Sequence, residues 1–360
     1  MIAANTPAQI QVLVVDDSAV VRQVMHALLS QEGDINVTVA ADPIFAMQKM
    51  KQFRPHVIVL DLEMPRMDGL TFLRKIMAED PIPTLICSSV AARGTLAAIR
   101  AMQEGAVGIV TKPKLAVGNF LHESAVMLID AVRSAAAARI RRRESFPVQQ
   151  KAKPPAPRIP VSSLPISGPK LIAIGASTGG TEALATILTA MPKDSPGIVV
   201  VQHMPEHFTA AFAKWLDNIC QVDVKEAEHG DVITPGKAFI APGNRQMSVF
   251  HLGESYRIRV NDGPLVSRHR PSVNFLFHSV AKAVGSDALG VILTGMGDDG
   301  ADGLLEMRNA GAYTFAQDEA SCVVFGMPKE AIVRGAVDKI LPLDCISAAL
   351  INHGAIAVSR

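Results

Sequence analysis

The sequence has few cysteines and almost no net charge, and each of these absences excludes a class of protein. Only four cysteines occur among 360 residues, and no two of them form a CxxC pair. A disulfide framework or a cysteine zinc site is therefore not expected, and a reducing compartment such as the cytoplasm fits this composition. The formal net charge is +1, so no overall field favours nucleic acid or a membrane surface as a partner.

Long apolar runs are also absent. No uninterrupted run reaches the roughly 20 residues that a membrane-spanning helix needs. The N-terminal segment MIAANTPAQIQ has no charged leader ahead of a long apolar core, as a secretory signal would have. We therefore expect a cytoplasmic protein with no direct membrane insertion.

Short apolar runs alternate with helical segments over the first third of the chain. Such runs are typical of strands buried in a parallel sheet. We expect strands at 11–15, 36–40, 57–60, 83–87 and 107–110, and helices at 19–30, 43–51, 69–78, 93–103 and 120–133. Five strands alternating with five helices predict an α/β domain with a doubly wound, five-stranded parallel sheet.

The composition changes after this first domain. An alanine- and arginine-rich stretch comes first, and prolines then recur between 147 and 169. Proline at this density cannot hold a helix or a central strand, so a linker is predicted. Its basic run at 139–143 is interpreted as a solvated helix end, with contact to an acidic partner as the alternative. We expect a first domain at 1–133, the linker at 134–169 and a second domain at 170–360.

A second α/β pattern fills the rest of the chain. Buried strands are expected at 171–174, 198–201, 289–293 and 312–315, and strand pairs near 238–260 predict an antiparallel edge. An apolar stripe from Phe208 to Ile219 predicts a helix whose apolar face lies in the core. The second domain is thus predicted to be doubly wound, mostly parallel α/β, with an antiparallel edge.

Three aspartates and one lysine stand at strand ends in the first domain. Asp16 and Asp17 end the first apolar run, Asp61 ends the third, and Lys112 follows the fifth. The carboxyl ends of parallel strands share one edge, so these side chains are expected to meet there. Like charges this close repel unless a cation lies among them, and carboxylate oxygens suit Mg²⁺. The pattern predicts transfer of a phosphoryl group to an aspartate, stabilised by Mg²⁺ and the lysine.

The segment DLEMPRMDG at 61–69 is the most specific local signal. With the acidic pair, the serines at 88–89 and Lys112-Pro113, it resembles a two-component receiver domain with a flavodoxin-like fold over roughly 10–133. The resemblance implies phosphorylation of Asp61. It further implies a Mg²⁺ site from Asp16, Asp17, Asp61 and a backbone carbonyl near Glu63, with Ser88 sensing the phosphoryl group and Lys112 binding it. Ser89 remains the alternative to Ser88, because strand register is not visible in the sequence.

A glycine-rich segment, GASTGG at 175–180, follows a predicted strand and opens a helix. Three interpretations compete: a capping serine in a glycine turn, a phosphate or dinucleotide loop at a helix N-terminus, and a nucleophilic serine in G-x-S-x-G. The dinucleotide pattern is imperfect, because Ser177 stands where its second glycine is expected. The next strand ends in His203 rather than in a ribose-binding acid.

His203 favours the nucleophile. Ser177 and His203 would lie at the carboxyl ends of consecutive strands, which are about 4.8 Å apart when they are neighbours. Asp299 follows a later buried strand, in the segment TGMGDDG. A serine hydroxyl needs a base, so His203 could take its proton while Asp299 fixes the imidazole tautomer. The helix N-terminus after Ser177 offers backbone N–H groups for an oxyanion.

Rival residues remain at this predicted site. Asp298 is the alternative to Asp299, being adjacent to it. The histidines interpreted as surface or core residues are His207, His229, His251, His278 and His353. The basic segment Arg268-His269-Arg270 supplies candidate substrate contacts.

Taken together, the receiver, the proline-rich linker and the motifs IGASTGG, VVVQHMP, APG and LTGMGDDG resemble the chemotaxis response-regulator protein-glutamate methylesterases. The resemblance implies hydrolysis of glutamate γ-methyl esters on methyl-accepting chemotaxis receptors, with methanol released, and deamidation of receptor glutamines. It implies Ser177, His203 and Asp299 as the catalytic residues, with Thr178 and the Met296 backbone on the oxyanion side. It also implies a chemotaxis-type histidine kinase as phosphodonor, activation by phosphorylation and no cofactor for the esterase.

Two other functional classes differ from this one in testable features. A response regulator with a DNA-binding output would need a helix-turn-helix and a basic face after the linker. Residues 170–360 show an α/β pattern and no charge excess instead. A receiver fused to an oxidoreductase would bind a nicotinamide cofactor through its second half.

Overall fold

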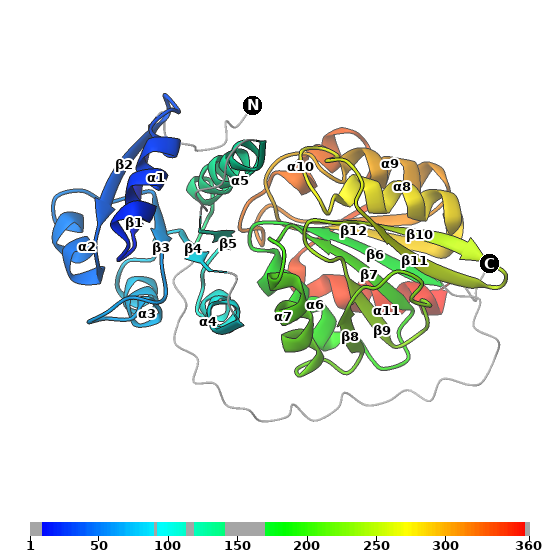
Figure 1. Cartoon of the computed structure of the whole chain (residues 1–360). Helices are drawn as coiled ribbons and strands as arrows, with labels where there is room; N and C mark the ends of the chain where they lie inside the picture. Colours follow the sequence, from blue (N-terminus) through cyan, green and yellow to red (C-terminus); the bar gives the residue numbers. More distant parts are fainter. Residues whose placement is uncertain (1–8, 90–91, 113–118, 141–169, 357–360) are drawn as a thin grey trace.

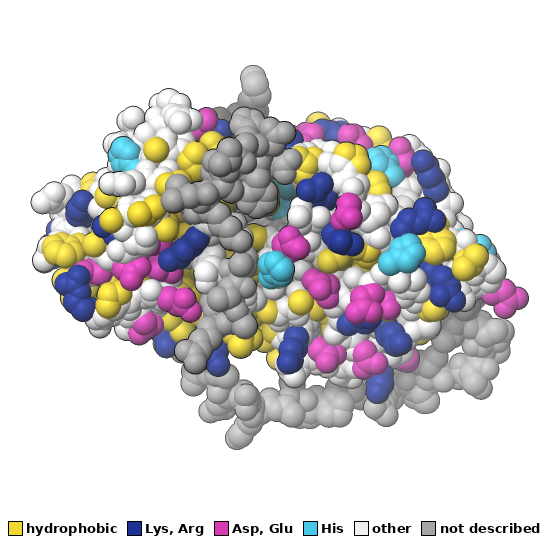
Figure 2. Space-filling model, viewed as in Figure 1, with side chains coloured by type: hydrophobic (Ala, Val, Ile, Leu, Met, Phe, Trp, Pro, Cys, Tyr) yellow, Lys and Arg dark blue, Asp and Glu magenta, His cyan; other side chains and the backbone are white. Residues whose placement is uncertain are grey.

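Two α/β units lie side by side in the computed structural model (Figure 1), which describes residues 9–89, 92–112, 119–140 and 170–356. Most of the predicted linker, 141–169, lies outside the described residues. Within them, no helix is both long and apolar enough to cross a membrane. Acidic and basic side chains are interspersed on the face shown in Figure 2, in line with the small net charge.

The N-terminal unit, which we call the receiver unit, is a five-stranded parallel sheet in the order β2-β1-β3-β4-β5. Its strands are β1 (Ile10–Val15), β2 (Ile35–Ala40), β3 (Val57–Leu60), β4 (Thr84–Ser88) and β5 (Gly108–Thr111). Its helices are α1 (Ala19–Leu29), α2 (Pro43–Met50), α3 (Gly69–Glu79), α4 (Ala92–Gln103) and α5 (Asn119–Ala136). This is the predicted alternation, and α5 ends three residues beyond the predicted boundary at 133.

Polar side chains begin the helices of the receiver unit directly after its strands. Ser18 accepts a hydrogen bond from the backbone N–H of Val21, and Asp42 and Asp68 cap α2 and α3 in the same way. Such caps satisfy the free N–H groups of the first helical turn. Because each cap follows the carboxyl end of a strand, the helix starts line the edge of the sheet where the acidic residues lie.

The C-terminal unit, which we call the catalytic unit, is built on a seven-stranded sheet in the order β14-β13-β12-β6-β7-β9-β8. All of its pairings are parallel. The strands are β6 (Leu171–Ala176), β7 (Gly197–Gln202), β8 (Asp223–Glu226), β9 (Lys237–Ile240), β12 (Ala288–Ile292), β13 (Tyr313–Gln317) and β14 (Lys339–Leu341). The helices are α6 (Gly180–Ala190), α7 (Phe208–Asp217), α8 (Val273–Ala283), α9 (Ala301–Asn309), α10 (Met327–Val333) and α11 (Leu343–Ile356), with a 3₁₀ turn, η1 (Gly285–Asp287).

The antiparallel strands differ in position from the predicted edge. β10 (Gln246–Leu252) and β11 (Ser255–Asn261) form a two-stranded sheet of their own, whereas β9 joins the main sheet in parallel. Met247, Val249 and Ile258 are buried, and Val249 N donates to Ser279 Oγ of α8 at 2.9 Å. The pair therefore buries one face against α8 and leaves the other to solvent, as antiparallel ribbons often do.

The two units are in direct contact. Helix α4 packs against α6 and α7, and a cavity of about 310 Å³ there is lined by Ile99 and Met102 from one unit and by Phe212 and Trp215 from the other. This contact joins the apolar cores of both units into one cluster. The receiver unit thus lies against the helices that follow β6 and β7.

Arg139, from the basic run after α5, also bridges the units. Its backbone N–H donates to Val323 O at 2.8 Å, and its guanidinium lies 3.0 Å from Glu319. The guanidinium is 62% exposed. The acidic contact considered as the alternative for this run is therefore present, with its partner in the same chain; residues 141–143 lie outside the described part.

Gly175 allows α8 to approach β6 closely. A Cβ at this position would lie 2.2 Å from Val273 Cγ1, on the first residue of α8. We expect Gly175→Ala to lower the unfolding free energy of the catalytic unit by about 1–3 kcal/mol, because the extra methyl overpacks a stiff side chain. Calorimetry of the full chain would measure this. Gly33→Ala, where no atom lies within 4 Å of the new methyl, serves as the control; equal melting temperatures for both variants would contradict the expectation.

Candidate functional site

The predicted acidic residues meet at the carboxyl edge of the receiver sheet. Ligand oxygens of Asp16, Asp17 and Asp61 all lie within 4.8 Å of one another. Asp16 and Asp61 are 1% and 2% exposed, whereas Asp17 is exposed. Lys112 Nζ lies 2.7 Å from Asp61 Oδ2 and 3.0 Å from Asp16 Oδ2. The structure therefore assembles the three carboxylates and the ammonium that the sequence predicted.

This acidic cluster holds more negative charge than Lys112 balances. Burial raises the pKa of Asp61, and the hydrogen bond from Lys112 only partly offsets it. Burial opposes the charge on Lys112 too, but the bonds to Asp61 and Asp16 outweigh it and raise the lysine pKa. Among the described residues, the buried Asp16 Oδ2 has an ion pair with Lys112 Nζ but no hydrogen bond. Three carboxylates that share one ammonium, with a buried oxygen that accepts no hydrogen bond, fit a site for Mg²⁺.

Glu63 and Ser88 lie beside the cluster. The Glu63 side chain is exposed, and its backbone N–H donates to Asp61 Oδ1 at 3.3 Å, which puts its peptide group next to the Asp61 carboxylate. Ser88 is the last residue of β4, is 3% exposed, and accepts the backbone N–H of Lys112 through its carbonyl. Their roles in holding metal and sensing phosphate remain predictions.

Ser177 and His203 follow adjacent strands of the catalytic unit, as predicted. β6 pairs with β7, and the His203 N–H donates to Ala176 O at 3.1 Å. Ser177 stands between β6 and α6, and its N–H donates to Thr294 O at 3.0 Å. Among the hydrogen bonds of the described residues, none joins the Ser177 and His203 side chains. Catalytic hydrogen bonds often tighten only when substrate binds.

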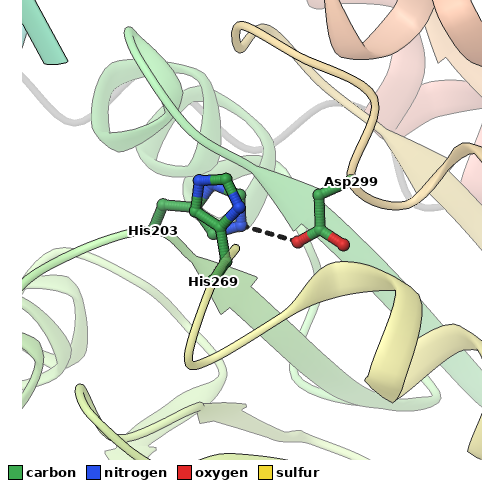
Figure 3. Close-up of side chains that lie close together, drawn as sticks. All are labelled: His203, His269 and Asp299. Atoms are coloured by element: carbon green, nitrogen blue, oxygen red, sulfur yellow. Dashed lines mark hydrogen bonds and ion pairs between the residues drawn. The ribbon is translucent and has the colours of Figure 1, made fainter. Parts of the chain in front are cut away.

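Asp299 is the acid that pairs with His203. Its Oδ2 lies 2.8 Å from His203 Nε2 (Figure 3), and it is 1% exposed. The N-terminus of α8 surrounds it with three further donors: Ser272 Oγ at 2.7 Å, Val273 N at 2.7 Å and Asn274 N at 2.9 Å. Four donors to one buried carboxylate leave it in the ionised form that a triad needs.

The pKa of Asp299 reflects this environment. Burial opposes ionisation, but the hydrogen bonds from His203 and the α8 backbone outweigh it, so the pKa lies below its ordinary value. Ionised Asp299 therefore stabilises the fold above the carboxyl's usual pKa, and this stabilisation is lost as pH falls through the lowered value. At neutral pH the acid is charged, and His203 donates to it through Nε2.

That bond determines which ring nitrogen is free. When His203 carries its proton on Nε2 and donates it in a hydrogen bond to Asp299, Nδ1 is the ring nitrogen with the free lone pair. Nδ1 is buried, and no described residue forms a hydrogen bond with it. An unpaired buried acceptor at the sheet edge beside Ser177 fits a base that takes the serine proton.

Asp298, the rival acid, has different partners. Arg334 Nη2 lies 2.7 Å from Asp298 Oδ2, and Arg334 Nη1 is 2.5 Å from Asp302. Asp298 is also 48% exposed. These ion pairs hold Asp298 toward α10, so Asp299 is the partner of His203.

The basic segment 268–270 divides into three different environments. The His269 ring stacks on His203, with centroids 3.8 Å apart and planes 6° from parallel (Figure 3). Burial and the neighbouring His203 lower the pKa of His269 to about 3, so it is neutral. Arg270 is bound to Asn244 Oδ1 and Gly263 O. Arg268 is exposed and lies 3.9 Å from Asp130 of α5, and its contact with a substrate stays a prediction.

His203, His269 and Asp299 also place ligand atoms within 4.8 Å of one another. Stacked, parallel imidazoles direct their in-plane lone pairs side by side. A tetrahedral zinc site needs lone pairs that converge on one point. This geometry supports stacking rather than metal binding.

Thr178 and Met296 lie close to Ser177. Thr178 Oγ1 lies 2.6 Å from Ser134 Oγ of α5, and its carbonyl accepts from Thr294 Oγ1 at 2.9 Å. Met296 follows Gly295, where a Cβ would lie 2.7 Å from Ser177 Cβ. The Met296 peptide is therefore close to Ser177, as an oxyanion-side position requires.

Ser272, whose hydroxyl donates to Asp299, was not among the residues predicted for the site. The available signal was a serine directly before an apolar helical segment, typical of an N-cap, and Ser272 does cap α8. Four of the five histidines interpreted as surface or core residues have neighbours elsewhere in the fold. His278 lies near Glu306, His207 near Glu206, His251 near Tyr256 and His353 near Tyr313.

Comparison with known proteins identifies the family of each unit. A family model described as CheB methylesterase matches residues 172–350, and one described as response regulator receiver domain matches residues 12–117. The protein-glutamate methylesterase/protein-glutamine glutaminase 1 of Anaeromyxobacter dehalogenans is 53% identical over 350 residues, covering 95% of this chain and 98% of the relative. The protein-glutamate methylesterase/protein-glutamine glutaminase 3 of Leptospira interrogans is 54% identical over 340 residues, covering 94% of this chain and 98% of the relative.

A solved structure supports the same assignment. The crystal structure of the Thermotoga maritima CheB methylesterase catalytic domain has a TM-score of 0.50 and 39% identity, and the match covers 52% of this chain and 99% of that domain. The fold class and the enzyme class predicted from the sequence are thereby confirmed. The chain belongs to the protein-glutamate methylesterase/protein-glutamine glutaminase family, in which a response regulator receiver domain precedes a CheB methylesterase domain.

Proposed function

We propose that Ser177 is the nucleophile of this esterase, His203 its base and Asp299 the acid that orients His203. One observation carries the proposal. His203 is bound to a buried, ionised Asp299 through Nε2 and keeps a buried, unpaired Nδ1 at the sheet edge where Ser177 stands. The motif supplies the residue types, and this geometry supports their roles.

The reaction then follows the serine-hydrolase pattern. Ser177 Oγ attacks the γ-carbonyl carbon of a glutamate methyl ester while its proton moves to His203 Nδ1. The tetrahedral oxyanion is met by backbone N–H groups at the start of α6 and near Met296. Collapse breaks the bond to the methoxy group, which takes the proton from His203 and leaves as methanol, and water then hydrolyses the acyl-enzyme by the same route. A glutamine side chain gives ammonia in place of methanol.

These steps use the chain's own side chains and water, so we propose that the esterase needs no cofactor. The substrates would be the methyl-accepting chemotaxis receptors of a chemotaxis-type pathway, reached from the cytoplasm. A histidine kinase of that pathway would phosphorylate Asp61, with Mg²⁺ held by Asp16, Asp17 and the peptide at Glu63. We retain 1–133, 134–169 and 170–360 as the proposed receiver, linker and catalytic domains.

The receiver unit is proposed to restrain the esterase. Ser134 of α5 bonds to Thr178, the residue after the nucleophile, and Val107 O accepts the N–H of Gly179 at 3.2 Å. Asp130 of α5 lies near Arg268. A receptor helix therefore has to displace α5 to reach the site. Phosphorylation of Asp61 would add charge at the acidic edge of the receiver sheet and shift the equilibrium toward release of the catalytic unit.

Removing the proposed nucleophile should remove the reaction. We expect Ser177→Ala to lower kcat by about 10⁴-fold or more, because the base then has no hydroxyl to activate. Methanol released from methylated receptor membranes is the measurement. Ser255→Ala, in the β10–β11 hairpin, is the matched control and should retain full turnover. Turnover by Ser177→Ala near that of the control would contradict the assignment.

Mg²⁺ should stabilise the receiver unit through its carboxylates. At a concentration 100 times the dissociation constant, a ligand adds about 2.7 kcal/mol, and we expect a higher melting temperature for the wild type. Asp16→Asn and Asp61→Asn should lose this response.

The pKa of Asp61 is raised in the fold, so its ionised form destabilises the metal-free protein at neutral pH, and Asp61→Asn should melt higher without metal. The exposed Asp194→Asn is the control; an unaltered Mg²⁺ response in Asp61→Asn would exclude the site.

Phosphorylation should separate the units and raise activity. The single tryptophan, Trp215, lines the cavity shared with Ile99 and Met102, so a small acyl phosphate should change its fluorescence and stimulate methanol release together. Asp61→Asn should show neither response and keep basal activity.

Ser134→Ala should raise basal activity up to about fivefold, since one neutral hydrogen bond contributes roughly 1 kcal/mol. Stimulation without any fluorescence change would argue against release of α4.

A further inference from the structure

Gln202 joins the backbones of the proposed nucleophile and base. It is the last residue of β7 and is 3% exposed. Its Nε2 donates to Ser177 O at 2.9 Å and to His203 O at 3.1 Å. One carboxamide thus spans the two strand ends from which the catalytic side chains project.

The other half of this carboxamide is unsatisfied. Gln202 Oε1 is buried and has no hydrogen-bond partner among the described residues. Turning the amide over would not help, because the oxygen would then face the carbonyls of Ser177 and His203. A buried acceptor without a donor costs stability. The arrangement therefore persists against a stability cost, as features retained for function often do.

The start of α6 is shaped around this amide. A Cβ on Gly180 would lie 2.1 Å from Gln202 Oε1 and 2.7 Å from Ala176 Cβ, so the absence of a side chain at Gly180 gives the amide its space. The N–H of Gly180 also donates to Ser177 O at 2.7 Å. The carbonyl of the nucleophile therefore accepts two hydrogen bonds, one along α6 and one from the neighbouring strand.

We propose that Gln202 is a positioning residue for the esterase reaction. By tying Ser177 O to His203 O it sets the approach of Ser177 Oγ to His203 Nδ1. This inference rests on the proposed roles of Ser177 and His203. Errors of about 1 Å in such an approach can lower turnover about 100-fold, whereas substrate binding does not depend on it. Loss of the tie should therefore lower kcat and leave KM unchanged.

Two full-length variants test this. Gln202→Met keeps the volume and removes both N–H donors together with the orphaned oxygen. We expect its kcat for methanol release to fall 10- to 100-fold, with KM within twofold of the wild type. The rate at which a fluorophosphonate labels Ser177 should fall by the same factor. The melting temperature of the catalytic unit should stay the same or rise. Gln202→Glu would place a carboxylate against the carbonyl oxygens of Ser177 and His203, which repel it. Its kcat should fall at least as far as that of Gln202→Met.

Thr314→Val is the control for a buried hydrogen bond of the same sheet outside the site. Thr314 is fully buried, and its Oγ1 donates to Ala336 O at 2.7 Å. This variant should melt lower and keep the wild-type kcat and labelling rate. The opposite patterns in Thr314→Val and Gln202→Met separate a structural hydrogen bond from a positioning one.

The outcomes are decisive in each direction. Wild-type kcat and labelling in Gln202→Met or Gln202→Glu would overturn the inference. A Gln202→Met chain that fails to fold or melts well below the wild type would make Gln202 a structural residue and would also overturn it. If Ser177→Ala retains turnover, the proposed function itself fails. If Ser177→Ala is inactive while both Gln202 variants are fully active, only the positioning role fails.

Discussion

The buried charge of Asp299 is the constraint on which the catalytic unit depends. A carboxylate that is 1% exposed remains ionised only if donors surround it. Three of its donors come from the start of α8 and the fourth from His203. The start of α8 must therefore lie against the carboxyl edge of the sheet, which Gly175 makes sterically possible. The segment leading into α8 is drawn to the same place, and it carries His269 onto the face of His203.

The two units use the same sheet edge in opposite electrostatic ways. In the catalytic unit every oxygen of the buried acid is satisfied, and its pKa falls. In the receiver unit the buried acids outnumber the single lysine, one oxygen has no hydrogen-bond partner, and burial raises the pKa of Asp61. The first arrangement is preorganised and changes little during a reaction. The second is incomplete in charge, which suits a site whose state is meant to change when a cation and a phosphoryl group arrive.

Much of this was predictable from the sequence, for a physical reason. Parallel strands are short apolar runs, and their carboxyl ends gather at one edge, so Asp61, Lys112, Ser177 and His203 could be located from the order of runs alone. Contacts that depend on tertiary packing could not be located in this way. The sequence predicted an antiparallel pair of strands but did not predict that this pair packs against α8. The alternation of apolar and polar residues along a strand does not specify what the strand packs against. The stack of His269 on His203 follows from the path of a loop, which no local pattern encodes. The motif favoured Asp299 over Asp298, but the different partners of the two acids are visible only in the fold.

The polar contacts between the units are individually weak, which fits the reversible restraint proposed above. Ser134 and Thr178 share one neutral hydrogen bond, and the Arg139–Glu319 pair is more than half exposed on both sides. Arg268 and Asp130 are 3.9 Å apart, and a cavity of about 310 Å³ interrupts the packing between α4 and α7. Exposed ion pairs contribute about 0–1 kcal/mol each. Moving a two-state equilibrium from 1:99 to 99:1 takes about 5.5 kcal/mol. The polar contacts are small beside that figure, so the apolar packing of α4 against α6 and α7 is the larger part of what the proposed release of the receiver unit must overcome.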